Sequence, residues 1–232
     1  IKSITDADGN KISKSFGNYK DPREYINAYG VDAVRYFALR EVSFGSDGAF
    51  SEEALINRTN ADLVNNLGNL VNRTISMSHK YFDGVVENPK VNEEIDNDLI
   101  NAVTNLKIKV DEKMDGLKVN EALEEIFEVL KRCNKYIDET RPWELAKNEE
   151  TDKLKSSMYH LIENIRKIAI CLLPFMENTS KDILRQIGMP EDLRTWNSLY
   201  EYDKLHGIKV IEKGEPIFMR KNVEEELEYL RN

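Results

Sequence analysis

Two lysines and two serines lie together near the start of the chain, in the segment Lys11-Ile12-Ser13-Lys14-Ser15. Glycines at positions 9 and 17 lie on either side, so the segment has little apolar surface to bury and the character of a mobile loop. Ammonium and hydroxyl groups suit a polyphosphate whose negative charge grows as a bond breaks. The segment therefore predicts a phosphate-binding loop, with a solvated turn as the alternative for so short a pattern.

A second candidate site lies in a predicted helix further along the chain. Asn69 and Arg73 are four residues apart, so their side chains emerge one turn apart on the same face. The apolar residues between 63 and 71 mark the opposite, buried face. An amide beside a guanidinium can bind the edge of an unpaired base. From spacing alone, a solvated surface pair is the more common explanation.

A tryptophan follows a proline where another predicted helix breaks. Pro142 has a fixed φ that can present the Trp143 indole outward, where an unpaired base could stack on it. The alternative is a core tryptophan that closes one end of the fold, and spacing alone favours this alternative. Trp196 belongs to no recognised motif and is expected to pack internally.

Composition limits the kinds of partner that the chain can bind. The 232 residues carry a net charge of −9, which argues against nucleic-acid binding through a broad basic surface. Any RNA contact must therefore be local. No apolar run approaches the roughly 20 residues that cross a bilayer, and no signal-peptide pattern is present, so no membrane partner is expected.

The cysteines and histidines point to neither disulfides nor a metal site. Cys133 and Cys171 fall among apolar positions of separate predicted helices, which favours buried, reduced thiols and a cytoplasmic location. His79, His160 and His206 are scattered, with no metal-ligand spacing.

The first 50 residues have mixed character. Asp21 followed by Pro22 predicts a capped helix start, and this helix should end near Gly30. A second short helix is expected over 32–40, and residues 42–50 are irregular, with one brief strand.

From Ser51 onward the apolar period is helical throughout, and Ser51 followed by Glu52 and Glu53 predicts a capped helix start. Because each helix is apolar on one side, the expected fold is an all-α helix bundle. The expected domains are residues 1–50 and 51–232. An extended tail is predicted over 193–220. Helices are predicted at about 51–82, 95–114, 123–137, 154–172, 180–187 and 223–230.

The lysine–serine segment resembles the KMSKS signature of class I aminoacyl-tRNA synthetases, with Ile12 at the methionine position. That swap conserves volume and should leave the loop working. Over about residues 4–190 the chain resembles the methionyl-tRNA synthetase family, in GVDAVRYF, FGSDGAF, NNLGNLVNR and RPWELAK. The tail segment EPIFMRKN departs from the family pattern, which often has a second proline and an acidic residue there.

The resemblance assigns roles to the KISKS loop, as we call residues 11–15. It implies that Lys14 and Lys11 stabilise the ATP and pyrophosphate transition state, with Ser13 and Ser15 as supporting donors. ATP, with magnesium in the full enzyme, and methionine are the implied substrates. A class I loop normally comes after a nucleotide-binding sheet, so the chain is expected to be the end of a catalytic domain together with the helical region after it. The chain alone should be inactive and bind no cofactor tightly.

The resemblance also implies an anticodon-binding bundle and tRNA(Met) as the partner. It assigns Asn69 and Arg73 to the first anticodon base, cytosine, and Trp143 with Pro142 to stacking. The helix over 51–82, at 1.5 Å per residue, should separate this site from the KISKS loop by roughly 45 Å. Two alternatives remain: a sister synthetase for cysteine, leucine, isoleucine or valine, and a non-catalytic helical RNA-binding module.

Overall fold

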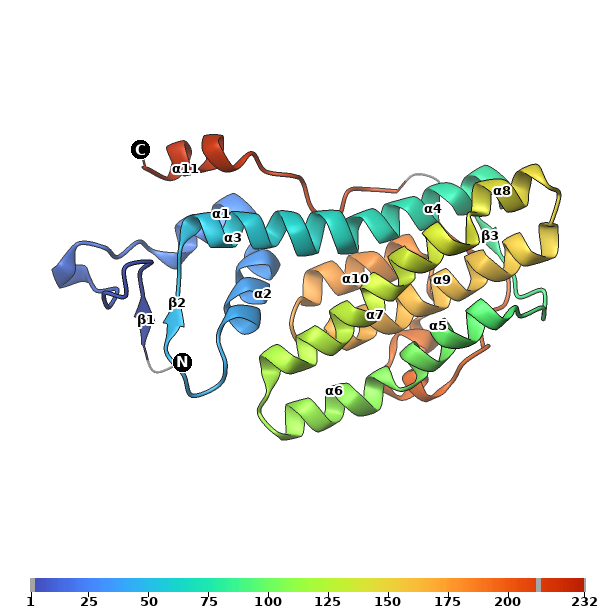
Figure 1. The fold of residues 1–232 in the computed structure, drawn as a ribbon, viewed down its shortest axis with the longest axis horizontal. Helices are drawn as coiled ribbons and strands as arrows, with labels where there is room; N and C mark the ends of the chain where they lie inside the picture. Colours follow the sequence, from blue (N-terminus) through green and yellow to red (C-terminus); the bar gives the residue numbers. More distant parts are fainter. Residues whose placement is uncertain (1–2, 212–213, 232) are drawn as a thin grey trace.

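The computed structural model describes residues 3–211 and 214–231. Residues 1–2, 212–213 and 232 lie outside this description, and so does the part of the predicted 193–220 tail that falls on 212–213. Figure 1 shows an elongated molecule with a small N-terminal region at one end and a helix bundle filling the rest. One long helix connects the two.

The N-terminal region contains two helices beside a minimal sheet. Strand β1 (Ile4–Thr5) pairs in parallel with β2 (Gly48–Ala49), which confirms the brief strand predicted within 42–50. Helix α1 (Pro22–Tyr29) begins as predicted, because the Asp21 side chain accepts a hydrogen bond from the Arg23 amide. Helix α2 (Val31–Glu41) follows directly and packs against α1.

The long helix combines α3 (Glu52–Arg58), the π-helical segment η2 (Thr59–Gly68) and α4 (Asn69–Phe82). Ser51 caps its start by accepting a hydrogen bond from the Ala54 amide, as its sequence predicted. The π-helical middle was not predicted; such segments are rare and frequent at functional sites. Figure 1 shows the helix running from the N-terminal region to the far end of the bundle.

The bundle packs around α9. Its helices are α5 (Glu94–Thr104), α6 (Leu106–Asp115), α7 (Val119–Thr140), α8 (Pro142–Lys147), α9 (Thr151–Leu172) and α10 (Glu177–Gln186). The predicted helix over 95–114 is divided at Asn105, and α8 was not predicted. The prediction that the helix over 154–172 has one exposed, polar side is wrong, because residues 156–172 are all buried. Helices α4, α5, α7 and α10 pack around α9, so it has no solvent face.

Burial of α9 places charged side chains inside the protein. Arg166 and Glu163 are fully buried and form a two-bond pair, with Arg166 Nη2 to Glu163 Oε1 at 2.7 Å. Arg166 also donates to the Leu193 carbonyl, and Lys167 donates to the Leu199 carbonyl. These bonds compensate the buried charges and attach the segment after α10 to the bundle.

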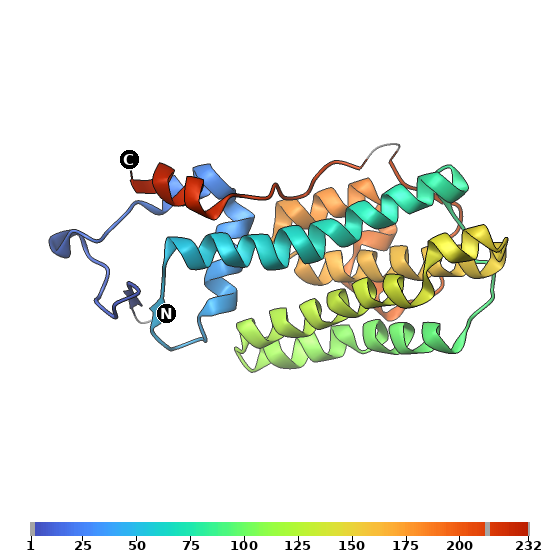
Figure 2. The same cartoon turned by 45° about the horizontal axis from the view of Figure 1, so that its top comes forward.

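The C-terminal segment crosses the molecule back toward the N-terminal region. Instead of a purely extended tail it contains η3 (Glu191–Arg194), η4 (Trp196–Tyr200) and β4 (Ile208–Lys209), which pairs antiparallel with β3 (Val85–Val86). Figures 1 and 2 show the last helix, α11 (Val223–Arg231), beside α3. The short turns of η3 and η4 form where the segment folds over α9.

Side-chain amides hold this segment in place despite its departure from the family pattern. The Gln186 amide exchanges two 3.0 Å hydrogen bonds with the Glu215 backbone, as a neighbouring strand would. Asn60 does the same with the Lys221 backbone, at 2.8 and 3.0 Å. The segment is therefore anchored to both α10 and the long helix.

Candidate functional site

The KISKS loop extends from a small hairpin. Lys11 bridges to Thr5, and the Ile12 amide donates to the Ile4 carbonyl at 2.9 Å, so the start of the loop lies antiparallel to β1. The chain then forms the short helix η1 (Lys14–Phe16), capped by the Ser13 side chain. A left-handed Gly17, with φ of 80°, ends this turn.

The side chains of the loop face solvent. Lys11 and Lys14 are exposed, and neither forms an ion pair with a residue that the structure describes. Lys14 Nζ lies 5.2 Å from the Tyr19 ring centroid, a cation–π contact of about 0.5–1 kcal/mol at an exposed site. The Ser13 and Ser15 hydroxyls lie 3.3 Å apart. The sequence thus places two ammonium groups and two hydroxyls where an anion can approach them.

The pair predicted to bind a base lies on α4. Asn69 is exposed, and the Arg73 side chain is 31% exposed, as the apolar pattern predicted. Arg73 Nη2 lies 3.2 Å from Asp138 Oδ1, on the last turns of α7. Asp138 itself is 67% exposed, so this contact orients the guanidinium while leaving it accessible. Asp138 was not among the predicted site residues; its place three residues before the RPW motif is a local signal for it.

Trp143 is 45% exposed, so the prediction of an outward ring holds and the core alternative does not. The backbone explains why. Arg141 has a left-handed conformation, with φ of 46°, and turns the chain sharply between α7 and α8. Pro142 is buried at the first position of α8 and anchors the corner. It supports the tryptophan and offers little surface of its own.

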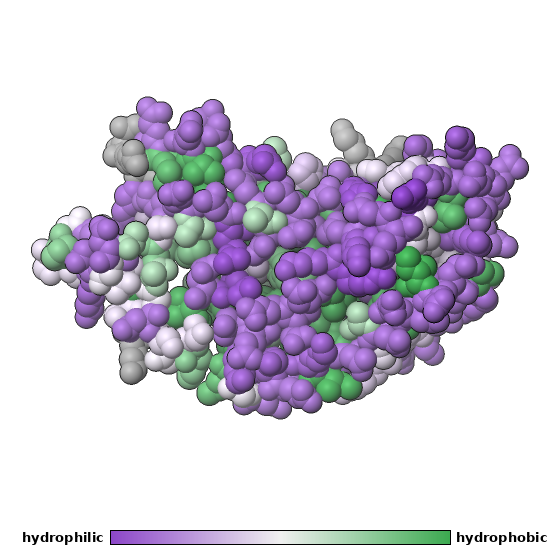
Figure 3. All heavy atoms as spheres, viewed as in Figure 1, coloured by the Kyte–Doolittle hydropathy of each residue, from purple (hydrophilic) through white to green (hydrophobic). Residues whose placement is uncertain are grey.

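We use the name far-end patch for the three residues predicted to bind the anticodon, Asn69 and Arg73 on α4 and Trp143 on α8; among the described residues, no hydrogen bond, ion pair or ring contact joins Trp143 to the other two. The Arg73–Asp138 contact brings α4 against the end of α7, five residues before Trp143. Figure 1 shows α4 and α8 at one end of the molecule and the segment that carries the KISKS loop at the other, joined by the long helix. The surface in Figure 3 is mainly hydrophilic, with small apolar areas between the helices.

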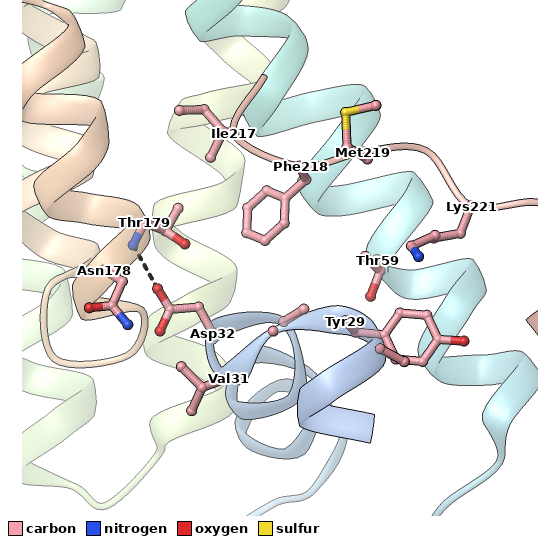
Figure 4. A pocket seen from close by; sticks show the side chains of 13 residues that line it. Tyr29, Val31, Asp32, Thr59, Asn178, Thr179, Ile217, Phe218, Met219 and Lys221 are labelled. Atoms are coloured by element: carbon pink, nitrogen blue, oxygen red, sulfur yellow. Dashed lines mark hydrogen bonds between the residues drawn. The ribbon is translucent and has the colours of Figure 1, made fainter. Parts of the chain in front are cut away.

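A separate hollow lies where the C-terminal segment passes the α1–α2 turn. It has a volume of about 570 Å³, and Figure 4 shows Asp32, Phe218 and Lys221 around it. Asp32 caps α10 by accepting a 2.6 Å hydrogen bond from the Thr179 amide. No residue of the KISKS loop or of the far-end patch lines the hollow.

Neither a metal site nor a membrane span occurs within residues 3–211 and 214–231. No group of three or more His, Cys, Asp and Glu side chains is arranged to hold a metal ion there. None of the helices in that part of the chain is long and apolar enough to span a bilayer. Cys133 and Cys171 are free and buried, as predicted, and burial raises the pKa of each thiol to about 12.

Comparison with protein families divides the chain in two. Residues 2–75 match the model of class I tRNA synthetases (M), and residues 96–232 match the anticodon-binding domain of tRNA ligase. The methionine–tRNA ligase of Caldanaerobacter subterraneus subsp. tengcongensis is 53% identical over 221 residues, which cover 95% of this chain and 34% of the relative. The ligase of Clostridium acetobutylicum is 46% identical over 224 residues. The chain spans about a third of the length of these relatives.

Solved structures agree with the sequence relatives. The Mycobacterium tuberculosis methionyl-tRNA synthetase in complex with methionyl-adenylate matches with a TM-score of 0.84 and 35% identity. The match covers 90% of this chain and 41% of that one. These relatives favour the methionine family over a sister synthetase or a non-catalytic RNA-binding module. The chain belongs to the methionyl-tRNA synthetase family of class I aminoacyl-tRNA synthetases.

Proposed function

We propose that this chain is a part, about a third in length, of a methionine–tRNA ligase, which we call the complete ligase. In it, residues 1–50 end the catalytic domain, and residues 51–232 bind the anticodon of tRNA(Met). The observation that carries this proposal is the separation of two exposed polar groups of residues by one continuous helix, α3 to α4. A protein that acts at both ends of a tRNA needs such a separation.

At the loop end, the proposed reaction joins methionine to ATP and releases pyrophosphate. Negative charge builds on the leaving pyrophosphate in the transition state. Lys14 and Lys11 are exposed cations on a backbone without a buried core, so they can close onto that charge as it develops. Contacts that strengthen in the transition state raise the rate of the chemical step. Ser13 and Ser15 add hydroxyl donors. Magnesium would arrive with the ATP phosphates.

At the far end, the patch combines a stacking surface with hydrogen-bonding groups. A flipped cytosine can stack on the Trp143 indole and bond through its edge to Asn69 and Arg73. Recognition by a few side chains fits the net charge of −9, because a general attraction to the phosphate backbone is then weak. Selectivity among tRNAs therefore depends on base contacts at this patch.

The proposed location is the cytoplasm. Both cysteines are free and buried, which fits a reducing compartment. Their raised pKa values keep the thiols protonated and unreactive at neutral pH.

Binding of short RNAs to this chain tests the anticodon assignment. The probes are anticodon stem-loops with cytosine or guanine at the first anticodon position. We expect the cytosine probe to bind about 10–100-fold more tightly, which corresponds to about 1–3 kcal/mol per specific base contact. Arg73→Ala should remove that preference, whereas Arg23→Ala, an exposed arginine on α1, should retain it. Equal binding of both probes by the unaltered chain would contradict the proposal.

A further inference from the structure

One asparagine beyond the KISKS loop contacts the backbone on both sides of Ile12. The Asn18 Oδ1 atom accepts a hydrogen bond from the Ser13 amide at 2.9 Å. Its Nδ2 atom donates to the Lys11 carbonyl at 3.3 Å. A single planar amide thus fixes the two backbone groups between which the loop turns. Lys11 and Lys14 leave the backbone at or directly beside these fixed points.

The Asn18 side chain is itself oriented by a hydrogen bond to the Asp6 carboxylate. Asn18 Nδ2 also donates to Asp6 Oδ2 at 3.1 Å, across twelve positions of sequence. The Asp6 carboxylate accepts further bonds from the Asp8 and Asn10 amides, at 3.1 and 2.8 Å. These bonds, that from Asn18 foremost, hold the pKa of the Asp6 carboxyl below its usual range, so the group is ionised at neutral pH. A carboxylate fixed by the hairpin turn therefore orients the amide that fixes the loop.

The Asp6–Asn18 contact differs in kind from the other contacts of the loop. Residues 6–20 include no buried side chain, so apolar packing does not determine the loop conformation. Among described residues, the other bonds of the loop join positions closer in sequence: Ile12 to β1, the Phe16 amide to the Ser13 carbonyl and hydroxyl, the Ser13 hydroxyl to that of Ser15, and the Gly17 amide to the Lys14 carbonyl. Within residues 6–20, the Asp6–Asn18 contact alone connects the two ends of the segment through side chains.

We propose that Asn18, oriented by Asp6, is a positioning residue for the KISKS loop. Its side chain fixes the backbone positions from which the Lys11 and Lys14 side chains extend toward the phosphates. This inference rests on the proposed function of the loop. Neither Asp6 nor Asn18 needs to touch ATP. Loss of the amide leaves the lysines present but lets their backbone move, and a misplacement of about 1 Å at a reacting centre can lower a rate about 100-fold.

The test is methionine-dependent ATP–pyrophosphate exchange by the complete ligase. Asn18→Ala is expected to lower kcat by up to about 100-fold, the scale of such a misplacement, with the KM for methionine unchanged. Asn27→Ala, an exposed asparagine on α1, is the matched control and should leave both constants unchanged. Normal kcat in Asn18→Ala would overturn the inference.

Exchanging the two partners separates positioning from a general structural role. Asn18→Asp places two carboxylates together, and Asp6→Asn places two amide donors together, so each variant should lose activity. The double variant Asp6→Asn/Asn18→Asp restores a donor facing an acceptor, and the new carboxylate still accepts from the Ser13 amide, but it cannot donate to the Lys11 carbonyl as Asn18 Nδ2 does. We therefore expect partial recovery, with a kcat above that of Asn18→Asp, which lacks the same bond to Lys11. A double variant no better than Asn18→Asp would overturn the inference.

Two additional readouts distinguish this inference from the proposed function. In this chain alone, Asn18→Ala should speed hydrogen exchange of the Ser13 amide; unchanged exchange would refute the positioning role. In the same pyrophosphate assay, Lys14→Ala reports on the loop itself. If Lys14→Ala is fully active, the proposed function fails. If Lys14→Ala is impaired and Asn18→Ala is not, only the positioning role fails.

Discussion

The KISKS loop and the far-end patch are held by opposite means. Residues 6–20 bury no side chain, and a network of amide and carboxylate hydrogen bonds fixes the loop. The far-end patch lies on helices whose other faces are in the core. Leu70, Val71 and Ile75 form the buried face of α4, and the buried Pro142 anchors the turn of α8 that carries Trp143. The difference matches the proposed tasks. The hydrogen bonds fix the loop backbone, while the exposed Lys11 and Lys14 side chains can still close onto a developing charge; side chains that discriminate one base must stay in place.

If the bundle is the rigid half of the molecule, removing one member of its buried charge pair should lower the free energy of unfolding by the largest amount. Arg166→Met leaves Glu163 fully buried without its two-bond partner. We expect the chain to lose about 3–5 kcal/mol of unfolding free energy, as is usual when one member of a buried pair is removed. Urea denaturation of the chain measures this.

A surface pair provides the control for that variant. Lys181 and Glu177 are both more than 60% exposed, so Lys181→Met should cost less than about 1 kcal/mol. Equal losses in the two variants would show that the buried pair is no part of what makes the bundle rigid.

The loop should contribute to rate and not to stability. In the complete ligase, Lys14→Ala should cost on the order of 3 kcal/mol of transition-state stabilisation, as for the loss of one preorganised donor. Methionine binding should hardly change. Pyrophosphate exchange and equilibrium methionine binding measure the two quantities, with Lys204→Ala, an exposed tail lysine, as control. Equal losses in rate and binding would indicate a uniform contact instead.

Stacking at the far end should be weaker than the loop effect. Trp143→Ala in this chain should weaken binding of the cytosine stem-loop by about 1–3 kcal/mol, the usual scale for one stacked base. Because the ring is 45% exposed, the urea unfolding midpoint should change little. A large loss of stability with no loss of RNA affinity would show that Trp143 supports the fold and does not stack on the base.

The bundle should also respond to mild acid more than the loop does. His160 is buried between the Tyr202 hydroxyl, at 2.7 Å, and Asn92 Oδ1, at 3.0 Å, and burial lowers its pKa although Asp96 and Asp203 oppose the shift. The unfolded histidine binds a proton below its ordinary pKa of 6.5, and the folded one does so only at lower pH. Stability is therefore complete above 6.5 and falls as the pH drops below it.

The slope of that fall is at most about 1.4 kcal/mol per pH unit for one proton. Urea unfolding between about pH 7 and pH 5.5 measures it, a range chosen to lie above the ordinary carboxylate pKa values. His160→Gln should flatten the curve, and His206→Gln, at an exposed site, should not. Identical curves for His160→Gln and the unaltered chain would contradict the assignment.

Local signals in the sequence were sufficient for several elements. Asp21 and Ser51 cap their helices through bonds to amides two or three residues away, so the sequence predicts them directly. The exposure of Asn69 and Arg73 followed from the apolar period of one helix. The family resemblance supplied the proposed roles of the KISKS loop.

The features that escaped prediction depend on contacts between distant residues. The α9 helix is buried all round because α4, α5, α7 and α10 converge on it, which its own period does not encode. The Arg73–Asp138 contact depends on how α7 meets α4. The Asp6–Asn18 bond joins two polar residues of a kind that usually lies free on a surface.

The central claim is that the two ends of the molecule serve two different steps. Its most direct test is to measure Trp143→Ala in the complete ligase for both pyrophosphate exchange and charging of tRNA(Met). We expect charging to fall by about 10–100-fold, which corresponds to about 1–3 kcal/mol for one lost stacking contact, while exchange stays close to normal. A parallel fall in both rates would contradict the claim, because the tryptophan would then support the catalytic half as well.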